Sequence, residues 1–190
     1  NTACTYGGGS VTSITADSYR VYVTDGSNVF QALADGTGSY AFGASTLSNL
    51  SSYSGTAVVR CEKQRLWVGK GRYLWQVTDT SAAAGLGTLL TDTNPLMMTH
   101  PSSAWQWTDF AEGPNAVYAA GSANGVSSIY MMTLSASSTA VSVNVPTVVA
   151  DLPRGETVTC LAGYLGRFLA VGTNKGLRIA TINTDGTLQV

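Results

Sequence analysis

The stretch RVYVTDGSNVFQAL at residues 20–33 decides the fold, because it returns at residues 65–78 as RLWVGKGRYLWQVT. The two stretches align without a gap at an offset of 45 residues. Each has a short apolar run, a turn that contains glycine, and a second apolar run. This order is typical of a β-hairpin, so each copy predicts two antiparallel strands.

Two more divergent copies follow, AVYAAGSANGVSSIYMMTL at residues 116–134 and RFLAVGTNKGLRIATI at residues 167–182. Aligning Tyr22, Trp67, Tyr118 and Leu169 gives successive offsets of 45, 51 and 51 residues. Each hairpin is preceded by another apolar strand, and the first three are followed by a fourth. The expected first strands are Val11–Ile14, Ala57–Cys61, Ala104–Trp107 and Thr157–Leu161, and the expected fourth strands are Tyr40–Phe42, Gly87–Leu90 and Val141–Val149.

Four strands per unit, at a period of 45 to 51 residues, indicate an all-β fold made of four β-propeller blades. We place these blades in one array at about residues 10–55, 56–101, 102–155 and 156–190. Blades stack on one another, so the inner strands should be buried on both faces. We expect the stability to depend on large aromatic side chains, namely Tyr22, Phe30, Trp67, Trp75, Trp107 and Tyr118.

The four blades either close into a small ring or form an arc of a larger propeller. We favour the arc, because the last repeat is short and the first residue is Asn1 rather than Met. The sequence is expected to be a processed product or a piece of a longer chain. An open arc leaves unpaired blade faces that need to be covered.

The composition narrows the classes of partner. The chain has 10 basic and 11 acidic residues and a net charge of −1, so it lacks the basic excess that binds nucleic acid. Its apolar stretches are too short to predict membrane insertion. Cys4, Cys61 and Cys160 lie far apart, and we interpret Cys61 and Cys160 as small apolar residues within strands.

No catalytic arrangement emerges from the reactive residue types, and no cofactor or metal is predicted. His100 is the only histidine and lies in an expected loop, without a Gly-x-Ser-x-Gly motif to accompany it. Glu62 and Glu156 flank inner strands without an obvious mate. The eight aspartates are expected in or beside turns, at positions 17, 25, 35, 79, 92, 109, 151 and 185.

The sequence resembles β-propeller proteins as a class, without the WD40 or sialidase signatures. Residues 169–189, LAVGTNKGLRIATINTDGTLQ, are similar to propeller segments of bacteriophage tail and baseplate proteins, as is the bias towards Ala, Ser, Thr and Gly. This resemblance implies a non-enzymatic structural protein of the virion, which contacts other proteins of an assembly, including copies of itself. It also implies a role in host attachment, with a cell-surface glycan as a further partner.

The alternative is a secreted propeller lectin or polysaccharide-degrading enzyme. In both cases the loops between second and third strands, and those between blades, should share one face. We expect that face to be the contact surface. Its polar tips are predicted to be Arg72, His100, Asn124, Arg154 and Lys175.

Overall fold

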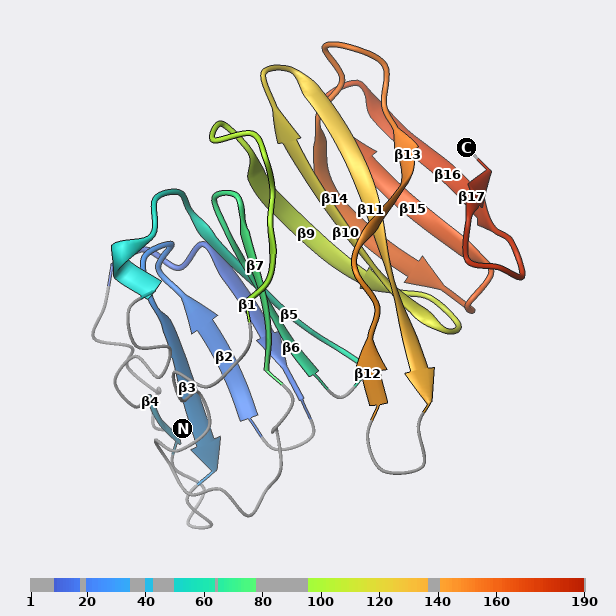
Figure 1. Cartoon of the computed structure of the whole chain (residues 1–190). Helices are drawn as coiled ribbons and strands as arrows, with labels where there is room; N and C mark the ends of the chain where they lie inside the picture. The colour runs from blue at the N-terminus through green and yellow to red at the C-terminus, as the bar shows by residue number, and fades with distance from the viewer. Residues whose placement is uncertain are drawn as a thin grey trace.

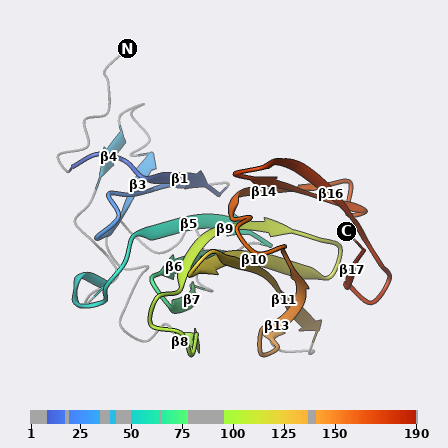
Figure 2. The ribbon, with the colours of Figure 1, turned by 90° about the horizontal axis from the view of Figure 1, so that it is seen from above.

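The computed structural model describes residues 9–17, 20–34, 40–42, 50–63, 65–77, 96–136 and 141–189. These residues form four antiparallel sheets in chain order, which we call blades 1 to 4. The blades lie side by side from the N-terminal to the C-terminal end of the chain (Figure 1). Seen from above, they fan out from their first strands as an arc of propeller blades (Figure 2). The predicted all-β fold is confirmed.

Each blade is a meander of neighbouring strands. Blade 1 contains β1 (Ser13–Ala16), β2 (Arg20–Thr24), β3 (Val29–Ala34) and β4 (Tyr40–Phe42). A 3-10 turn, η1 (Leu50–Ser52), precedes blade 2. Blade 2 contains β5 (Ala57–Glu62), β6 (Arg65–Lys70), β7 (Tyr73–Val77) and β8 (Leu96–Thr99).

Blade 3 has a divided outer edge. Its strands are β9 (Gln106–Glu112), β10 (Ala116–Ala123), β11 (Val126–Ala136), β12 (Val141–Val143) and β13 (Thr147–Asp151). Both β12 and β13 pair with the long strand β11, at different points along it. Blade 4 contains β14 (Val158–Tyr164), β15 (Phe168–Thr173), β16 (Gly176–Ile182) and β17 (Leu188–Gln189). Among the described residues, no helix is long and apolar enough to cross a membrane.

The predicted fourth strands have three outcomes. Tyr40–Phe42 forms β4 as expected, and the expected strand at 141–149 divides into β12 and β13. The segment Gly87–Leu90 lies outside the described residues. In blade 2 the strand that pairs with β7 is β8 at Leu96–Thr99, outside the segment in which a fourth strand was expected.

Aromatic side chains fill the spaces between blades. Tyr22 lies in the cluster between blades 1 and 2, Trp67 and Trp107 between blades 2 and 3, and Tyr118 between blades 3 and 4. Each of the four is at most 1% exposed. The predicted aromatic anchors are therefore buried, with the exception of Phe30, which is only half-buried.

Blades 2 and 3 approach closely because a glycine faces a tryptophan. A Cβ atom on Gly69 of blade 2 would lie 2.6 Å from the Trp107 Cβ of blade 3. Within blade 3, a Cβ atom on Gly121 would lie 2.5 Å from the Trp105 ring, which belongs to the cluster shared with blade 2. Real side chains do not tolerate such distances, so these two positions hold glycine for reasons of space. All six residues of β6 are buried, as expected for a strand between two neighbouring blades.

The alignment of the fourth repeat needs a correction. Tyr118 points towards blade 4, but Leu169 points back towards blade 3, since both belong to the same cluster. The two-residue turns at Asn124 and Asn174 give an offset of 50 residues, not 51, between the hairpins of blades 3 and 4. Because strand side chains alternate between faces, this single residue reverses the face assigned to every residue of the repeat.

The Gly69–Trp107 contact predicts that a methyl group added at Gly69 destabilises the protein much more than one added at Gly9. Gly69→Ala should lower the free energy of unfolding by about 1–3 kcal/mol, because the blades must move apart to admit the Cβ atom. Gly9→Ala is the matched control, since a Cβ there meets no atom within 4 Å. Urea unfolding of both variants measures the difference. Equal effects would contradict close packing of blades 2 and 3 at Gly69.

Candidate binding face

The turns between second and third strands are joined to the loops between blades by a repeated backbone hydrogen bond. Ala57 N donates to Gly26 O (2.8 Å), Trp107 N to Gly71 O (3.2 Å), and Gly155 N to Gly125 O (2.8 Å). In each case the start of one blade binds the glycine in the turn of the preceding blade. All three turn glycines have positive φ, 85°, 53° and 75°, which other residues rarely adopt. We call this end of the arc the turn face.

Lys70 adds a side-chain link within the turn face. It is only 2% exposed, and its Nζ donates to Ser27 O (2.9 Å) and Leu50 O (3.0 Å). Burial lowers the pKa of its ammonium group. The ammonium group therefore ties the turn of blade 1 to blade 2 and is not available to a partner.

Four of the five predicted contact residues lie in the turns and loops of this face. Arg72 follows Gly71 in the β6–β7 turn, Asn124 precedes Gly125 in the β10–β11 turn, and Lys175 lies in the β15–β16 turn. Arg154 lies in the loop before blade 4. That loop joins two of the turns, because Gly155 donates to Gly125 and its carbonyl accepts from Asn174 Nδ2 (3.2 Å).

His100 also lies at this face, but in a packed environment. Its backbone N donates to Arg72 O (2.8 Å), and its ring stacks on Trp105 with centroids 4.0 Å apart. Its Nδ1 accepts a hydrogen bond from Ser102 N (3.1 Å), and burial lowers its pKa. His100 is therefore a half-buried part of an aromatic stack rather than the exposed tip that we expected.

The cations of the turn face have no ionic partner within the described part of the chain. The ion pairs there join Arg60 to Asp109, Lys63 to Glu112, and Arg178 to Glu156. None of them includes Arg72, Arg154 or Lys175. Arg154 and Lys175 are thus exposed in the loop before blade 4 and in its β15–β16 turn. Arg72 lies in the β6–β7 turn of blade 2, where it is half-buried, with its guanidinium 5.3 Å from the centre of the Tyr73 ring. The whole chain has a net charge of −1.

The carboxylate nearest to these cations is already neutralised. Glu156 accepts from Arg178 through both oxygens, at 2.7 Å each, and from the Thr173 hydroxyl at 2.9 Å. Its side chain is 7% exposed. The hydrogen bonds from Arg178 lower the pKa of this carboxyl to about 2. The partner of Glu156 is thus an arginine and not a second carboxylate, and the pair connects the loop before blade 4 to β16.

Asp109 connects three blades at the inner strands. Its carboxylate accepts two hydrogen bonds from Arg60 of β5 (2.8 and 2.9 Å) and one from Leu161 N of β14 (2.9 Å). The expectation that Asp109 lies in a turn was wrong, because it is within β9. It lies beside a bulge opposite Ala120 and Gly121, where the pairing with β10 shifts.

The other aspartates within the described residues have local roles. Asp25 accepts from Ser27 N and Asn28 N, and Asp17 from Arg20 N, as expected for turns. Asp151 accepts from the Ser128 hydroxyl of the paired strand (2.6 Å). Asp35, Asp79 and Asp92 lie outside the described residues. Each of these three carboxylates, like that of Asp109, thus accepts at least one hydrogen bond.

Glu62 and Glu112 form a carboxylate pair that the sequence analysis missed. They occupy the last positions of the neighbouring inner strands β5 and β9. Burial, together with the charge of Glu112, raises the pKa of Glu62 to about 7, against the opposing charge of Arg60. Glu112 corresponds to Cys61 of blade 2, so the repeat alignment does not place the two glutamates at equivalent positions and gives no sign of the pair. No group of three or more Cys, His, Asp or Glu in the described segments can hold a metal ion.

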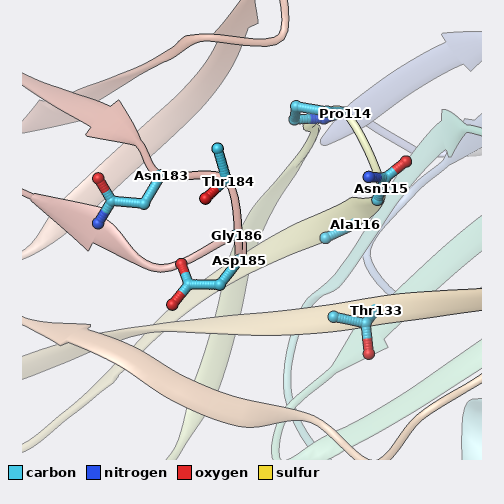
Figure 3. A pocket seen from close by; sticks show the side chains of 8 residues that line it. All are labelled: Pro114, Asn115, Ala116, Thr133, Asn183, Thr184, Asp185 and Gly186. Carbon is cyan, nitrogen blue, oxygen red and sulfur yellow. The ribbon is translucent and has the colours of Figure 1, made fainter.

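A small pocket lies at the opposite end of the strands, between blades 3 and 4 (Figure 3). The β16–β17 turn, Asn183–Gly186, lies on one side of it, and Pro114 and Asn115 lie on the other. Asp185 is its only charged lining residue. One oxygen of that carboxylate, Oδ1, accepts from Thr187 N (2.9 Å) and the Thr187 hydroxyl (2.7 Å), so Asp185 stabilises its own turn.

Two solved structures of similar shape support the fold. The computationally designed protein Ika4 matches with a TM-score of 0.59 and 11% identity, over 95% of this chain and 96% of that chain. The AfRom2 CNH domain matches with a TM-score of 0.51 and 13% identity, over 94% of this chain but only 54% of that chain. Human WBSCR16 has a TM-score of 0.49 at 15% identity. No family model and no curated protein matches the sequence.

The two glutamates of opposite pKa shift predict opposite responses to pH. The pKa of Glu62 is raised in the folded state, so stability falls as pH rises from about 4.3, the usual value, to about 7. Glu62→Gln should remove this fall and raise Tm at pH 8. The pKa of Glu156 is lowered, so its contribution is present above about pH 4.3 and is lost as pH falls towards 2.

Glu156→Gln should accordingly lower Tm at pH 7 and approach the unsubstituted protein in acid. Thermal unfolding of the two variants across this pH range measures both effects. A Glu62→Gln profile parallel to that of the unsubstituted protein would contradict the assignment. So would an unchanged Tm of Glu156→Gln at pH 7.

Proposed function

We propose that the chain is a non-catalytic structural module that binds an acidic protein surface through its turn face. The carrying observation is the set of cations Arg72, Arg154 and Lys175, which have no ionic partner among the described residues. The loop of Arg154 and the turn of Lys175 are joined by the hydrogen bond from Asn174 Nδ2 to Gly155 O, and the turn of Arg72 is held to blade 3 by the bond from Trp107 N to Gly71 O. Such a surface is held in place before binding, so little ordering cost opposes association.

The absence of a catalytic role is part of the proposal. Asp109 and Glu156 each bind an arginine through both carboxylate oxygens, and Asp185 is used within its own turn. His100 is stacked on Trp105. These contacts favour a structural use of the groups from which an active site is commonly built.

A second part of the proposal concerns the assembly to which the module belongs. The similarity of residues 169–189 to bacteriophage tail and baseplate segments supports a component of the virion tail. In that setting the turn face contacts a neighbouring tail protein or a host surface. This part depends on the sequence resemblance alone, whereas the choice of an acidic partner depends on the charges of the turn face.

Fluorescently labelled poly-L-glutamate is a direct probe of the proposed surface. Removing the three cations together, as Arg72→Ala, Arg154→Ala and Lys175→Ala, should weaken its binding about tenfold, equivalent to about 0.5 kcal/mol for each exposed pair. Fluorescence anisotropy at low salt measures the affinity, and added salt should weaken it further. The thermal unfolding midpoint should fall only slightly, because the three side chains make no ion pair in the described segments and the contact of Arg72 with the Tyr73 ring, 5.3 Å away, is worth about 0.5–1 kcal/mol at an exposed site.

The matched control removes positive charge from the opposite end of the strands. Lys63 and Arg167 lie in the turns after inner strands β5 and β14, so Lys63→Ala with Arg167→Ala leaves the turn face intact. This double variant should bind the probe as the unsubstituted protein does. An equal loss of binding in the control, or none in the triple variant, would contradict the proposed surface.

A further inference from the structure

Blade 4, at the C-terminal end of the arc, leaves one face of its sheet exposed (Figure 1). Leu169, Val171 and Ala180 point towards blade 3, so alternation places the residues beside them on the opposite side of the sheet. We call this side the end face. It is formed by alternate residues of β14, β15 and β16, chiefly Cys160, Ala162, Tyr164, Phe168, Leu177 and Ile179. None of these residues carries a charge.

The large apolar side chains of the end face meet water in the single chain. Leu177 is 70% exposed, Tyr164 63%, Ile179 54% and Phe168 39%. A side chain of this size has a surface of about 200 Å², so the four together expose about 450 Å². A contiguous apolar patch of this size on a folded protein marks an interaction site.

The end face lacks the carboxylate that joins blade 3 to blade 4. Asp109 of blade 3 accepts a hydrogen bond from Leu161 N of blade 4 (2.9 Å). The corresponding residue of blade 4 is Ala162, because Asp109 pairs with Ala120 and Ala162 pairs with Ala170 in the same register. An alanine cannot hold the inner strand of a further blade in this way. The end face is therefore suited to a purely apolar contact.

The shape and charge of the end face allow it to pack against a copy of itself. Ala162 and Ala170 lie side by side on neighbouring strands, and the larger Tyr164 and Phe168 form the next pair along the same two strands. Protruding rings thus adjoin a hollow, so two such faces can interdigitate. A two-fold contact places like residues opposite like residues, which a charged face would oppose by repulsion and this uncharged face does not.

We infer that the end face of blade 4 binds the end face of a second copy of this chain across a two-fold axis. The two sheets then pack face to face, about 10 Å apart. The four large side chains contribute about 900 Å² from both copies, and the rest of the face raises the buried area beyond the roughly 1,000 Å² that a specific interface needs. The inference goes beyond the proposed function and does not depend on the turn face.

Light scattering on a sizing column, at several concentrations of the unmodified chain, tests the inference. The expected particle has twice the 19.7 kDa mass of one chain and dissociates on dilution. Alkylation followed by peptide mass spectrometry gives a second reading, because Cys160 is exposed in the single chain and lies on the end face. In the two-copy particle this thiol should react at least about tenfold more slowly than after dilution, since the contact covers it.

A substitution on the end face tests whether that face makes the contact. Ile179→Arg should give single copies in which Cys160 reacts rapidly, because the contact would bury an unpaired charge on each copy. Val145→Arg, at a residue 78% exposed outside the end face, is the matched control and should leave the two-copy particle unchanged. Dye-labelled Ile179→Arg should join the unmodified chain at least about tenfold less than labelled Val145→Arg does, since the contact needs two intact end faces.

The opposite results overturn the inference. A single copy at every concentration, with a reactive Cys160, would show that the end face binds no second copy. A two-copy particle that survives Ile179→Arg would show that the contact lies elsewhere. Labelled Ile179→Arg that joins the unmodified chain, or larger open assemblies, would show that the end face binds a different surface of the second copy. Circular dichroism identifies loss of folding, and in that case the neutral Ile179→Ser replaces the arginine variant.

Discussion

Stacking imposes a constraint on every sheet of this protein: both faces of an inner blade must be covered by neighbours. In a sheet with one face in water, apolar and polar residues alternate along each strand. Here every residue of β6 is buried, and so is every residue of β10 except the last two. The cost of exposing such a strand grows with each apolar side chain that meets water. Blades 2 and 3 meet this condition within one chain, whereas blades 1 and 4 have only one described neighbour each.

Polar contacts fix the blades relative to one another where the inner strands converge. The Asp109 carboxylate binds Arg60 in one direction and the backbone of β14 in the other, so a single side chain sets the position of three sheets. At the turn face, backbone hydrogen bonds from one blade to the glycine of the preceding turn do the same at each junction. Apolar packing supplies the stability of the arc, and these directional bonds define its geometry.

The sequence was sufficient to predict the blades because hairpins are local. Alternating strands and glycine turns repeat visibly in the first two copies, and β2, β3, β6 and β7 form there. The face assigned to Leu169 was wrong because a face depends on register, and one residue in a divergent repeat cannot be placed by similarity alone. Asp109 was placed in a turn because its partners, Arg60 and Leu161, are distant in sequence.

The sequence likewise predicted only part of the candidate site. Position in a turn was enough to bring Arg72, Asn124, Arg154 and Lys175 to one end of the arc. The packing of His100 against Trp105 was not predicted. Both rings lie in the loop between β8 and β9, where no strand pairing indicates which side chains meet. Nor was the pairing of Glu62 with Glu112, which arises from the convergence of two inner strands.

The contact between Gly69 and Trp107 also limits how such an array can diverge or be rearranged. Each inner blade packs against a different neighbour on each of its two faces. A duplicated or transplanted blade is therefore expected to pack well only beside a neighbour with a complementary surface. A Cβ atom at position 69 would meet the Cβ atom of residue 107, which every residue except glycine carries, so position 69 should stay glycine as long as the two blades keep their spacing. Recombination of blades between related genes is therefore expected to succeed when adjacent blades are exchanged together with their shared junction.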